Sequence, residues 1–186
     1  MKKNDEQIHY LIQYKLDSFF GKFYCYFSEN GLYQMLLDEK VVISNKFKDK
    51  IKVVKLKEAP KKTSEIAQIN FEILKKEMNQ YFDKKFINFS VLLDFSFYTD
   101  FQKKVLNYLQ KIPVGKVESY KEVAINIGTP NANRAVGNAV GSNRTLIVIP
   151  CHRVIKSDGS AGWFGGYRVG TELKKNILKH EGIKIK

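Results

Sequence analysis

Cys151 and His152 are the residues whose types and positions most directly suggest chemistry. They follow the apolar run 146–149 and Pro150, so the sequence predicts a buried strand that the proline ends. A free thiol has a pKa of about 8.5, so a reactive cysteine needs a neighbour that generates or stabilises the thiolate. His152 could accept that proton, directly or through a water molecule. Neighbours in an extended segment point in opposite directions, so adjacency alone does not establish contact.

The other cysteine, Cys25, lies between aromatic residues in the segment FYCYF. A lone cysteine in such a setting is usually a small buried hydrophobic residue, and we expect that here. Two cysteines cannot form a disulfide framework, and their spacing matches no zinc pattern. We therefore expect no metal site and no cofactor.

Composition bounds the classes of protein that the chain can represent. With 186 residues, 44% of them hydrophobic and 27% charged, the chain fits one well-filled domain or two small ones. No apolar run reaches the roughly 18 residues that span a bilayer, and the N-terminus has no signal-peptide core. We expect a soluble, cytoplasmic protein, associated with the nucleoid if the source is prokaryotic.

The formal net charge of +13 favours a polyanionic partner, most often nucleic acid. A lysine-rich proteome explains the lysines of the first half equally well. The arginines are harder to explain in that way, because guanidinium groups suit phosphates and base edges. They all lie in the second half, at positions 134, 144, 153 and 168.

The first half of the chain is predicted to be a small α/β unit. An Asn-Gly turn joins two β-rich runs into a hairpin over 22–37. Helical spacing of apolar residues predicts an amphipathic helix that opens at Ser64. Its apolar positions are Ile66, Ile69, Ile73, Leu74 and Met78. Further predicted strands are 8–14, 41–43 and 51–56, and 83–97 is predicted to be extended.

The second half begins with helix signals. Thr99 and Gln102 form one capping box, and Ser119 and Glu122 form another, opening a short helix that stops at Gly128. A third helix is predicted over 131–140, so the last two form a helix-turn-helix candidate. The third helix consists mostly of small residues, and taken alone this favours an internal, tightly packed helix over a recognition helix.

The segment 149–154, Ile-Pro-Cys-His-Arg-Val, resembles the active-site motif of the O6-alkylguanine-DNA alkyltransferases, or methylated-DNA–protein-cysteine methyltransferases. Other matching motifs follow in the family's order and cover nearly all of residues 95–182. They are the helix start 99–105, Ser119-Tyr120, 133–137, Asn143, 166–168 and 180–182. Residues before 95 resemble the family more loosely, chiefly in the hairpin 21–37.

The resemblance implies a fold and a domain organisation. Residues 1–93 would form an α/β domain, ribonuclease H-like, with a small antiparallel sheet and a helix. Residues 94–186 would form a mainly α, winged helix-turn-helix-like domain that binds DNA and accepts the alkyl group.

The resemblance also implies DNA repair by direct reversal, in which Cys151 takes the alkyl group from O6 of guanine irreversibly and in a single turnover. His152 would deprotonate the thiol through a bridging water, and Glu181 would orient the imidazole. Tyr120 would donate a hydrogen bond to the guanine ring, and Asn143 would hold the loop before the active-site strand.

The implied partner is double-stranded DNA containing O6-alkylguanine. The protein would bind this DNA as a monomer and would not associate with a membrane. The nucleotide must be flipped out of the duplex, and Arg134 would take its place in the stack. The helix 132–141 would lie in the minor groove, which its small residues permit, and this reverses the preference for a packed internal helix. The implied DNA-contacting residues are Ser119, Tyr120, Arg134, Ala135, Gly137, Asn138 and Gly141.

The implied substrate pocket includes the carbonyls of Cys151 and Val154, which would accept from the guanine amino group. Its other residues are Pro150, Trp163, Phe164, Gly165 and Gly166. The interval from Cys151 to Glu181 is a few residues longer than the family pattern. The extra length falls in the lip loop 157–166, and we hypothesise that Trp163 lines the pocket.

Two other classes of protein compete with this interpretation. A winged-helix protein that binds alkylated DNA without repairing it is disfavoured by the presence of Cys151. A Cys-His hydrolase, with Glu181 completing its triad, gives no reason for the small-residue helix or for Arg134.

Overall fold

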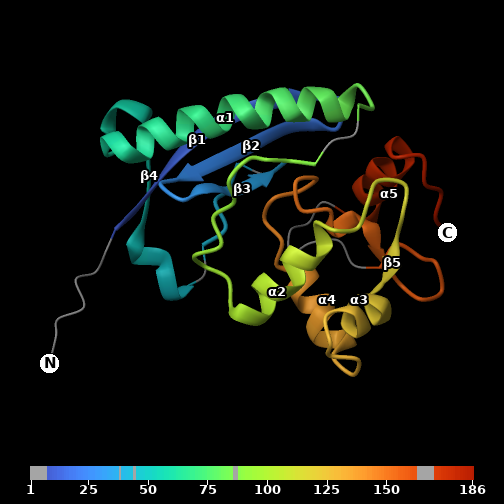
Figure 1. The fold of residues 1–186 in the computed structure, drawn as a ribbon. Helices are drawn as coiled ribbons and strands as arrows, with labels where there is room; N and C mark the ends of the chain where they lie inside the picture. Colours follow the sequence, from blue (N-terminus) through green and yellow to red (C-terminus); the bar gives the residue numbers. More distant parts are fainter. Residues whose placement is uncertain (1–7, 38, 44, 86–87, 163–169) are drawn as a thin grey trace, which may run out of the picture. The chain divides into compact units, whose positions relative to one another are not determined.

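The computed structural model describes residues 8–37, 39–43, 45–85, 88–162 and 170–186 (Figure 1). The chain divides into two compact units, one of Met1–Phe82 with Ile87–Ser96 and the other of Asp83–Phe86 with Phe97–Lys186. A small sheet combined with helices confirms the expected α/β character. Among the described residues, no helix has both the length and the apolar content needed to cross a bilayer.

The first unit contains a four-stranded sheet with the strand order β3-β2-β1-β4. β1 and β2 are antiparallel, as are β2 and β3, whereas β4 runs parallel to β1. The predicted hairpin is confirmed, and Gly31 is required at its turn. Its φ is +122°, and a Cβ there would lie 2.4 Å from the Leu92 carbonyl oxygen. The strands are β1 (His9–Ser18), β2 (Gly21–Ser28), β3 (Gly31–Leu36) and β4 (Ile51–Val54).

Helix α1 (Lys61–Phe82) packs along β1, β2 and β3 (Figure 1). It starts three residues before the predicted Ser64, whose N–H already donates to the Pro60 carbonyl at 3.0 Å. The buried stripe also differs from the prediction, since Ile69 is 61% exposed. Small and polar residues that pair with neighbouring segments take its place. The buried residues of α1 are Thr63, Ala67, Asn70, Leu74, Glu77, Met78 and Tyr81.

The predicted strand at 41–43 is absent, because side chains of β3 satisfy this segment's backbone. Val42 N–H donates to Gln34 Oε1 at 2.7 Å, and the Val42 carbonyl accepts from Tyr33 Oη at 2.7 Å. β4 is also shorter than predicted and is followed by a 3-10 turn, η2 (Leu56–Glu58). A second 3-10 segment, η1 (Asn45–Lys50), precedes β4.

The stretch 83–97 is predicted to be extended; in its described part, residues 83–85 and 88–97, one bridge joins it to the sheet, between Leu93 and Leu32. Leu32 N–H donates to the Leu92 carbonyl at 2.7 Å, and Asp94 N–H donates to the Leu32 carbonyl at 3.0 Å. The buried Asp94 carboxylate accepts from Ser28 Oγ at 2.5 Å. Residues 88–96 are therefore fastened to the first unit as irregular backbone.

Helices dominate the second unit. Both predicted capping boxes are confirmed, with Thr99 before α2 and Ser119 before α3, and the third helix lies within two residues of its predicted bounds. α2, α3 and α4 pack against one another, and α5 packs on η3. The elements are α2 (Asp100–Leu109), β5 (Glu118–Ser119), α3 (Tyr120–Asn126), α4 (Asn133–Gly141), η3 (Cys151–Arg153), β6 (Val154–Ile155) and α5 (Gly170–His180).

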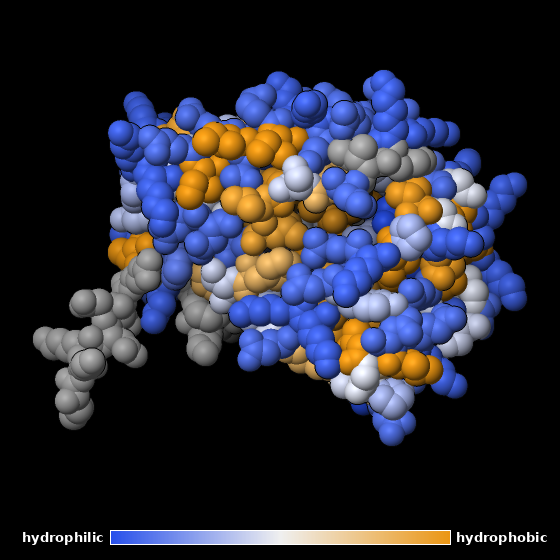
Figure 2. All heavy atoms as spheres, viewed as in Figure 1, coloured by the Kyte–Doolittle hydropathy of each residue, from blue (hydrophilic) through white to orange (hydrophobic). Residues whose placement is uncertain are grey.

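Each unit has its own apolar core. In the second, α2 packs against α4, and Val105, Leu106 and Leu109 of α2 and Val136, Ala139 and Val140 of α4 are buried. Hydrophilic residues cover most of the face seen in Figure 2, and hydrophobic residues gather there in separate patches. Cys151, His152 and Val154 are buried in the second unit.

Candidate active site

The segment 146–149 is buried as predicted, but it forms tight turns and not a strand. Ile147 has a φ of +70°, which a β-branched residue rarely adopts. The backbone bonds to itself, since Val148 N–H donates to the Leu146 carbonyl at 2.8 Å and Ile149 N–H to the Thr145 carbonyl at 3.0 Å. The turns deliver Cys151 into the interior at the start of η3.

Asn143 links these turns to the thiol. Its Nδ2 donates to Cys151 Sγ at 3.0 Å and to the Ile149 carbonyl at 2.9 Å. Its Oδ1 accepts from Thr145 N–H at 3.0 Å. One buried amide therefore fixes both the loop before Cys151 and the sulfur itself. The predicted loop-holding residue is thus in contact with the predicted nucleophile.

His152 and Glu181 also lie together as predicted, with Nε2 and Oε1 separated by 2.9 Å and both side chains fully buried. Sequence reasoning missed Arg153, which it treated as a candidate contact for DNA. The guanidinium is instead buried against Glu181, with Nε 2.9 Å from Oε2 and Nη2 2.7 Å from Oε1. Its place directly after His152 in the motif was the available signal.

Charge in this cluster follows from burial and hydrogen bonding. Burial raises the pKa of Glu181, but hydrogen bonds from His152 and Arg153 outweigh it and lower that pKa to about 2. Burial lowers the pKa of His152 in spite of Glu181. The carboxylate is therefore ionised and the imidazole neutral at neutral pH, as a general base requires.

Sequence reasoning also missed Lys174 on α5, a lysine that is 0% exposed. Its Nζ donates to the Val154 carbonyl. Burial lowers the pKa of Lys174 to about 8. Burial raises the pKa of the Cys151 thiol, whereas the hydrogen bond from Asn143 and the charge of Lys174 lower it. A lysine among the apolar residues Leu173, Ile177 and Leu178 of α5 was the signal in the sequence.

Tyr120, the first residue of α3, is near enough to Cys151 for their charges to interact. Burial and that interaction raise the pKa of Tyr120 to about 12, so its hydroxyl keeps its proton and can donate. A Cβ on Gly162, where φ is +64°, would lie 2.9 Å from the Tyr120 ring. The lack of a side chain at Gly162 therefore allows the backbone at this position to lie close to the Tyr120 ring.

The surface of α4 divides into two faces. Val136, Ala139 and Val140 are buried against the unit. Arg134, Ala135 and Asn138 are exposed, and Gly137 and Gly141 are half-buried. Among the pocket residues, Pro150 directly precedes Cys151, Val154 follows η3, and both are buried. Trp163, Phe164, Gly165 and Gly166 lie outside the described residues.

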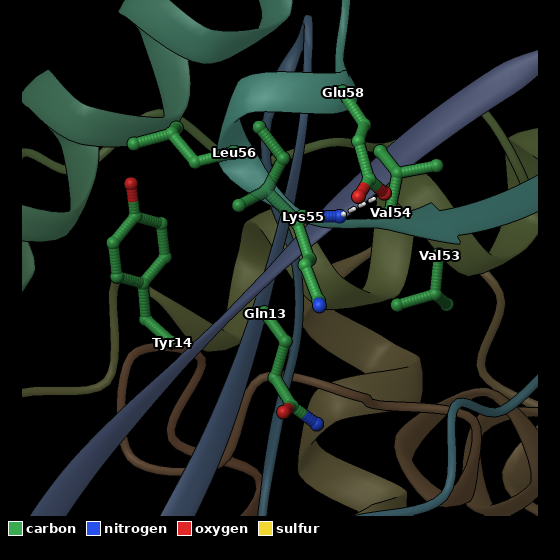
Figure 3. Close-up of a pocket in the computed structure, with 8 residues that line it drawn as sticks. Gln13, Tyr14, Val53, Val54, Lys55, Leu56 and Glu58 are labelled. Atoms are coloured by element: carbon green, nitrogen blue, oxygen red, sulfur yellow. Dashed lines mark hydrogen bonds between the residues drawn. The ribbon is translucent and has the colours of Figure 1, made fainter.

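A cavity in the first unit lies between β1, β4 and η2 (Figure 3). Gln13, Tyr14, Val53 and Lys55 face it, and Glu58 accepts the N–H of Lys55 at 3.2 Å. No thiol or imidazole is among its lining residues. Cys151, His152 and Glu181 all belong to the second unit.

Comparisons with known proteins address the same region. Residues 100–183 match the family model described as the 6-O-methylguanine DNA methyltransferase DNA-binding domain. A methylated-DNA–protein-cysteine methyltransferase of Scheffersomyces stipitis is 51% identical over 86 residues, which cover 46% of this chain and 43% of that protein. One from Saccharolobus islandicus is 41% identical over 109 residues, covering 59% of this chain and 68% of the relative. The chain belongs to the methylated-DNA–protein-cysteine methyltransferase family.

The family resemblance in the sequence is thereby confirmed, and a solved structure extends it to both units. Mycobacterium tuberculosis OGT in complex with DNA superposes with a TM-score of 0.72 at 30% identity, over 92% of this chain and 93% of that one. Among the curated methyltransferases, the matched segment spans 43% to 56% of the length of the first three.

Proposed function

We propose that this methyltransferase-family protein repairs O6-alkylguanine in double-stranded DNA by moving the alkyl group to Cys151. The observation that supports this most directly is the buried thiol held by Asn143, in the same unit as a His152–Glu181 pair and the consecutive short helices α3 and α4. The reaction is a direct reversal that uses each molecule once. We propose a cytoplasmic monomer that needs neither metal nor cofactor.

The transfer converts one thiol and one O6-alkylguanine into a thioether and guanine. His152 accepts the thiol proton, in the proposed role through a bridging water. Sγ attacks the alkyl carbon, the S–C bond forms, and the C–O6 bond breaks with its electron pair going to the guanine oxygen. Tyr120 donates a hydrogen bond to the guanine ring. The proton released from the thiol passes from His152 to the guanine, which leaves as a neutral molecule.

The backbone around η3 supplies the proposed acceptors for the guanine amino group. The Cys151 carbonyl accepts the Val154 N–H, and the Val154 carbonyl accepts from Lys174. A carbonyl oxygen has two lone pairs, so each can accept a further hydrogen bond. Pro150 and the lip residues 163–166 complete the proposed pocket.

The exposed face of α4 suits a helix that lies against DNA. In this proposal Arg134 enters the base stack in place of the flipped nucleotide, at a cost of a few kcal/mol for unstacking. Ala135, Gly137, Asn138 and Gly141 would let the backbone approach the minor groove, where little sequence is read. Ser119 and Tyr120 would contact the DNA from the start of α3.

The finer description of the fold belongs to the same proposal. An antiparallel β1-β2-β3 meander with β4 parallel to β1 supports a ribonuclease H-like first domain at 1–93. The pair α3–α4, with β5 and β6 beside α3, supports a winged helix-turn-helix-like second domain at 94–186.

Stoichiometry tests the proposed function. Increasing amounts of a duplex carrying one labelled O6-methylguanine are mixed with a fixed amount of protein, and label bound to protein is counted. We expect a plateau at about one methyl group per molecule and none for Cys151→Ser. Loss of methyl from DNA beyond one equivalent would indicate turnover and contradict the proposal. Tight duplex binding without loss of methyl would instead support a non-catalytic binding protein.

A further inference from the structure

The Arg153 side chain hydrogen-bonds to two other segments of the second unit. Its Nε and Nη2 form a two-point contact with both oxygens of Glu181, at 2.9 and 2.7 Å. Its Nη1 donates to the Ile112 carbonyl at 2.6 Å, in the turn that follows α2. The side chain is almost completely buried, so these contacts exclude water. A buried guanidinium with donors on three acceptors is rigidly held.

We propose that Arg153 is a positioning residue for alkyl transfer, which fixes Glu181 so that this carboxylate binds Nε2 of His152 and leaves Nδ1 as the proton acceptor. The proposal rests on the proposed function, since it assigns the means by which that site maintains its base. It extends the site to a residue that has no contact with substrate.

The tautomer of His152 is the property at stake. A neutral imidazole carries one N–H, and its other nitrogen accepts. An ionised Glu181 can only accept, so it selects the tautomer with hydrogen on Nε2. Nδ1 then presents a lone pair, and among the described residues no hydrogen-bond partner contacts that buried atom. A protonated Glu181 could donate to Nε2, which would place the hydrogen on Nδ1 and remove the base.

Arg153 prevents that reversal in two ways. Its positive charge opposes protonation of the buried Glu181, and its planar fork fixes the carboxylate in the plane of two hydrogen bonds. The Ile112 contact holds the guanidinium itself, so the turn after α2 anchors the cluster. Other charges near His152 are Lys174, which like Arg153 disfavours the imidazolium, and Glu181, which favours it.

Lysine cannot reproduce this arrangement. One ammonium has a single nitrogen and cannot bridge both carboxylate oxygens while it also reaches the Ile112 carbonyl. Arg153→Lys therefore keeps the charge and loses the geometry, whereas Arg153→Met loses both. Lys175→Met removes an exposed cation from α5 and serves as the control.

Nitrogen NMR of the His152 ring tests the proposal without any substrate. The signal is assigned by its loss in His152→Asn, because the chain has two other histidines. In the wild type and in Lys175→Met we expect hydrogen on Nε2 and an unprotonated Nδ1 at pH 7.5. In Arg153→Met we expect hydrogen on Nδ1 or exchange between tautomers, with a smaller change in Arg153→Lys.

The pH profile of methyl transfer gives a second measurement. We expect the acid limb to move up by about one unit in Arg153→Met, because the guanidinium that disfavours protonation of the cluster is gone. Arg153→Lys, which keeps a cation at the site, remains informative if the methionine variant does not fold. A wild-type tautomer and acid limb in every folded Arg153 variant would overturn the proposal. If the wild type transfers no methyl group, the proposed function fails, and the NMR result alone still decides the role of Arg153.

Discussion

At the scale of single residues, burial and hydrogen bonding act on the Cys151 thiol in opposite directions. Burial raises its pKa, and the Asn143 amide and the Lys174 charge lower it. In the proposed reaction, a neutral His152 beside an ionised Glu181 takes the thiol proton when substrate is bound. The buried thiol would then be protonated at rest and deprotonated only for the transfer.

Asn143→Ala removes the donor to Sγ and the acceptor of the Thr145 N–H, and it leaves the Ile149 carbonyl with the Cys151 N–H as its donor. We expect the free energy of unfolding to fall by about 1–3 kcal/mol. We expect methyl transfer to slow by about tenfold or more, since the donor to the thiolate is lost. Urea unfolding and single-turnover kinetics measure the two effects. Asn126→Ala, which removes an exposed amide from α3, is the control, and equal slowing in both variants would argue against the role of Asn143.

Glu181 predicts a pH dependence of stability. Its pKa is lowered on folding to about 2, so the unfolded chain binds the proton more tightly. Its contribution is complete above the ordinary carboxyl pKa of about 4.3 and is lost as the pH falls towards 2. We expect wild-type stability to fall by on the order of 3 kcal/mol more than that of Glu181→Gln between pH 6 and pH 2. Parallel pH profiles of urea unfolding for the two proteins would contradict this assignment.

At the scale of elements, the features predicted correctly are those that depend on neighbouring residues, and the features missed depend on contacts between residues far apart in the sequence. Thr99 and Ser119 were identified as helix caps because a capping box involves only four consecutive residues. The apolar run 146–149 was wrongly predicted as a strand, because its turns depend on a side-chain amide that precedes it in the chain. Burial of Arg153 against Glu181 joins residues 28 positions apart, which no local pattern contains.

Substitutions on the two faces of helix α1 test which face contributes to the free energy of unfolding. Leu74 is fully buried against the sheet, and Ile69 is largely exposed although both fit the apolar pattern. We expect Leu74→Ala to lower the free energy of unfolding by about 2–5 kcal/mol. We expect Ile69→Lys to change it by less than about 0.5 kcal/mol. Urea unfolding of both variants is the measurement, and a large loss from Ile69→Lys would show that the buried face has been wrongly assigned.

At the scale of the whole molecule, the proposed function requires the chain both to bind a polyanion and to extract one base from it. The formal net charge of +13 favours the first requirement, and DNA affinity should fall steeply with salt. The sequence motifs yield a prediction of which residues carry out the second requirement. They did not predict how those residues are held, because Arg153 and Lys174 act through burial in the folded unit.

The proposed role of Arg134 is in extracting the base and not in the chemical step, so a variant at this residue tests the two separately. It is exposed on α4 and has no place in the Cys151 cluster. We expect Arg134→Ala to slow repair of an O6-methylguanine duplex by about tenfold or more, because flipping loses the side chain that fills the stack. Reaction with free O6-benzylguanine should stay within about twofold of wild type, since no flipping is needed. Rate constants for both substrates are compared, and equal slowing on both would remove Arg134 from the flipping step.

The central claim is that Cys151 itself becomes alkylated. Intact-protein mass spectrometry after reaction with an O6-methylguanine duplex, followed by peptide mapping, tests it most directly. We expect a single gain of about 14 Da, the mass that one methyl group adds in replacing the thiol hydrogen, on the peptide that contains Cys151. An unchanged mass with duplex binding intact, or a gain on any other residue, would contradict the claim.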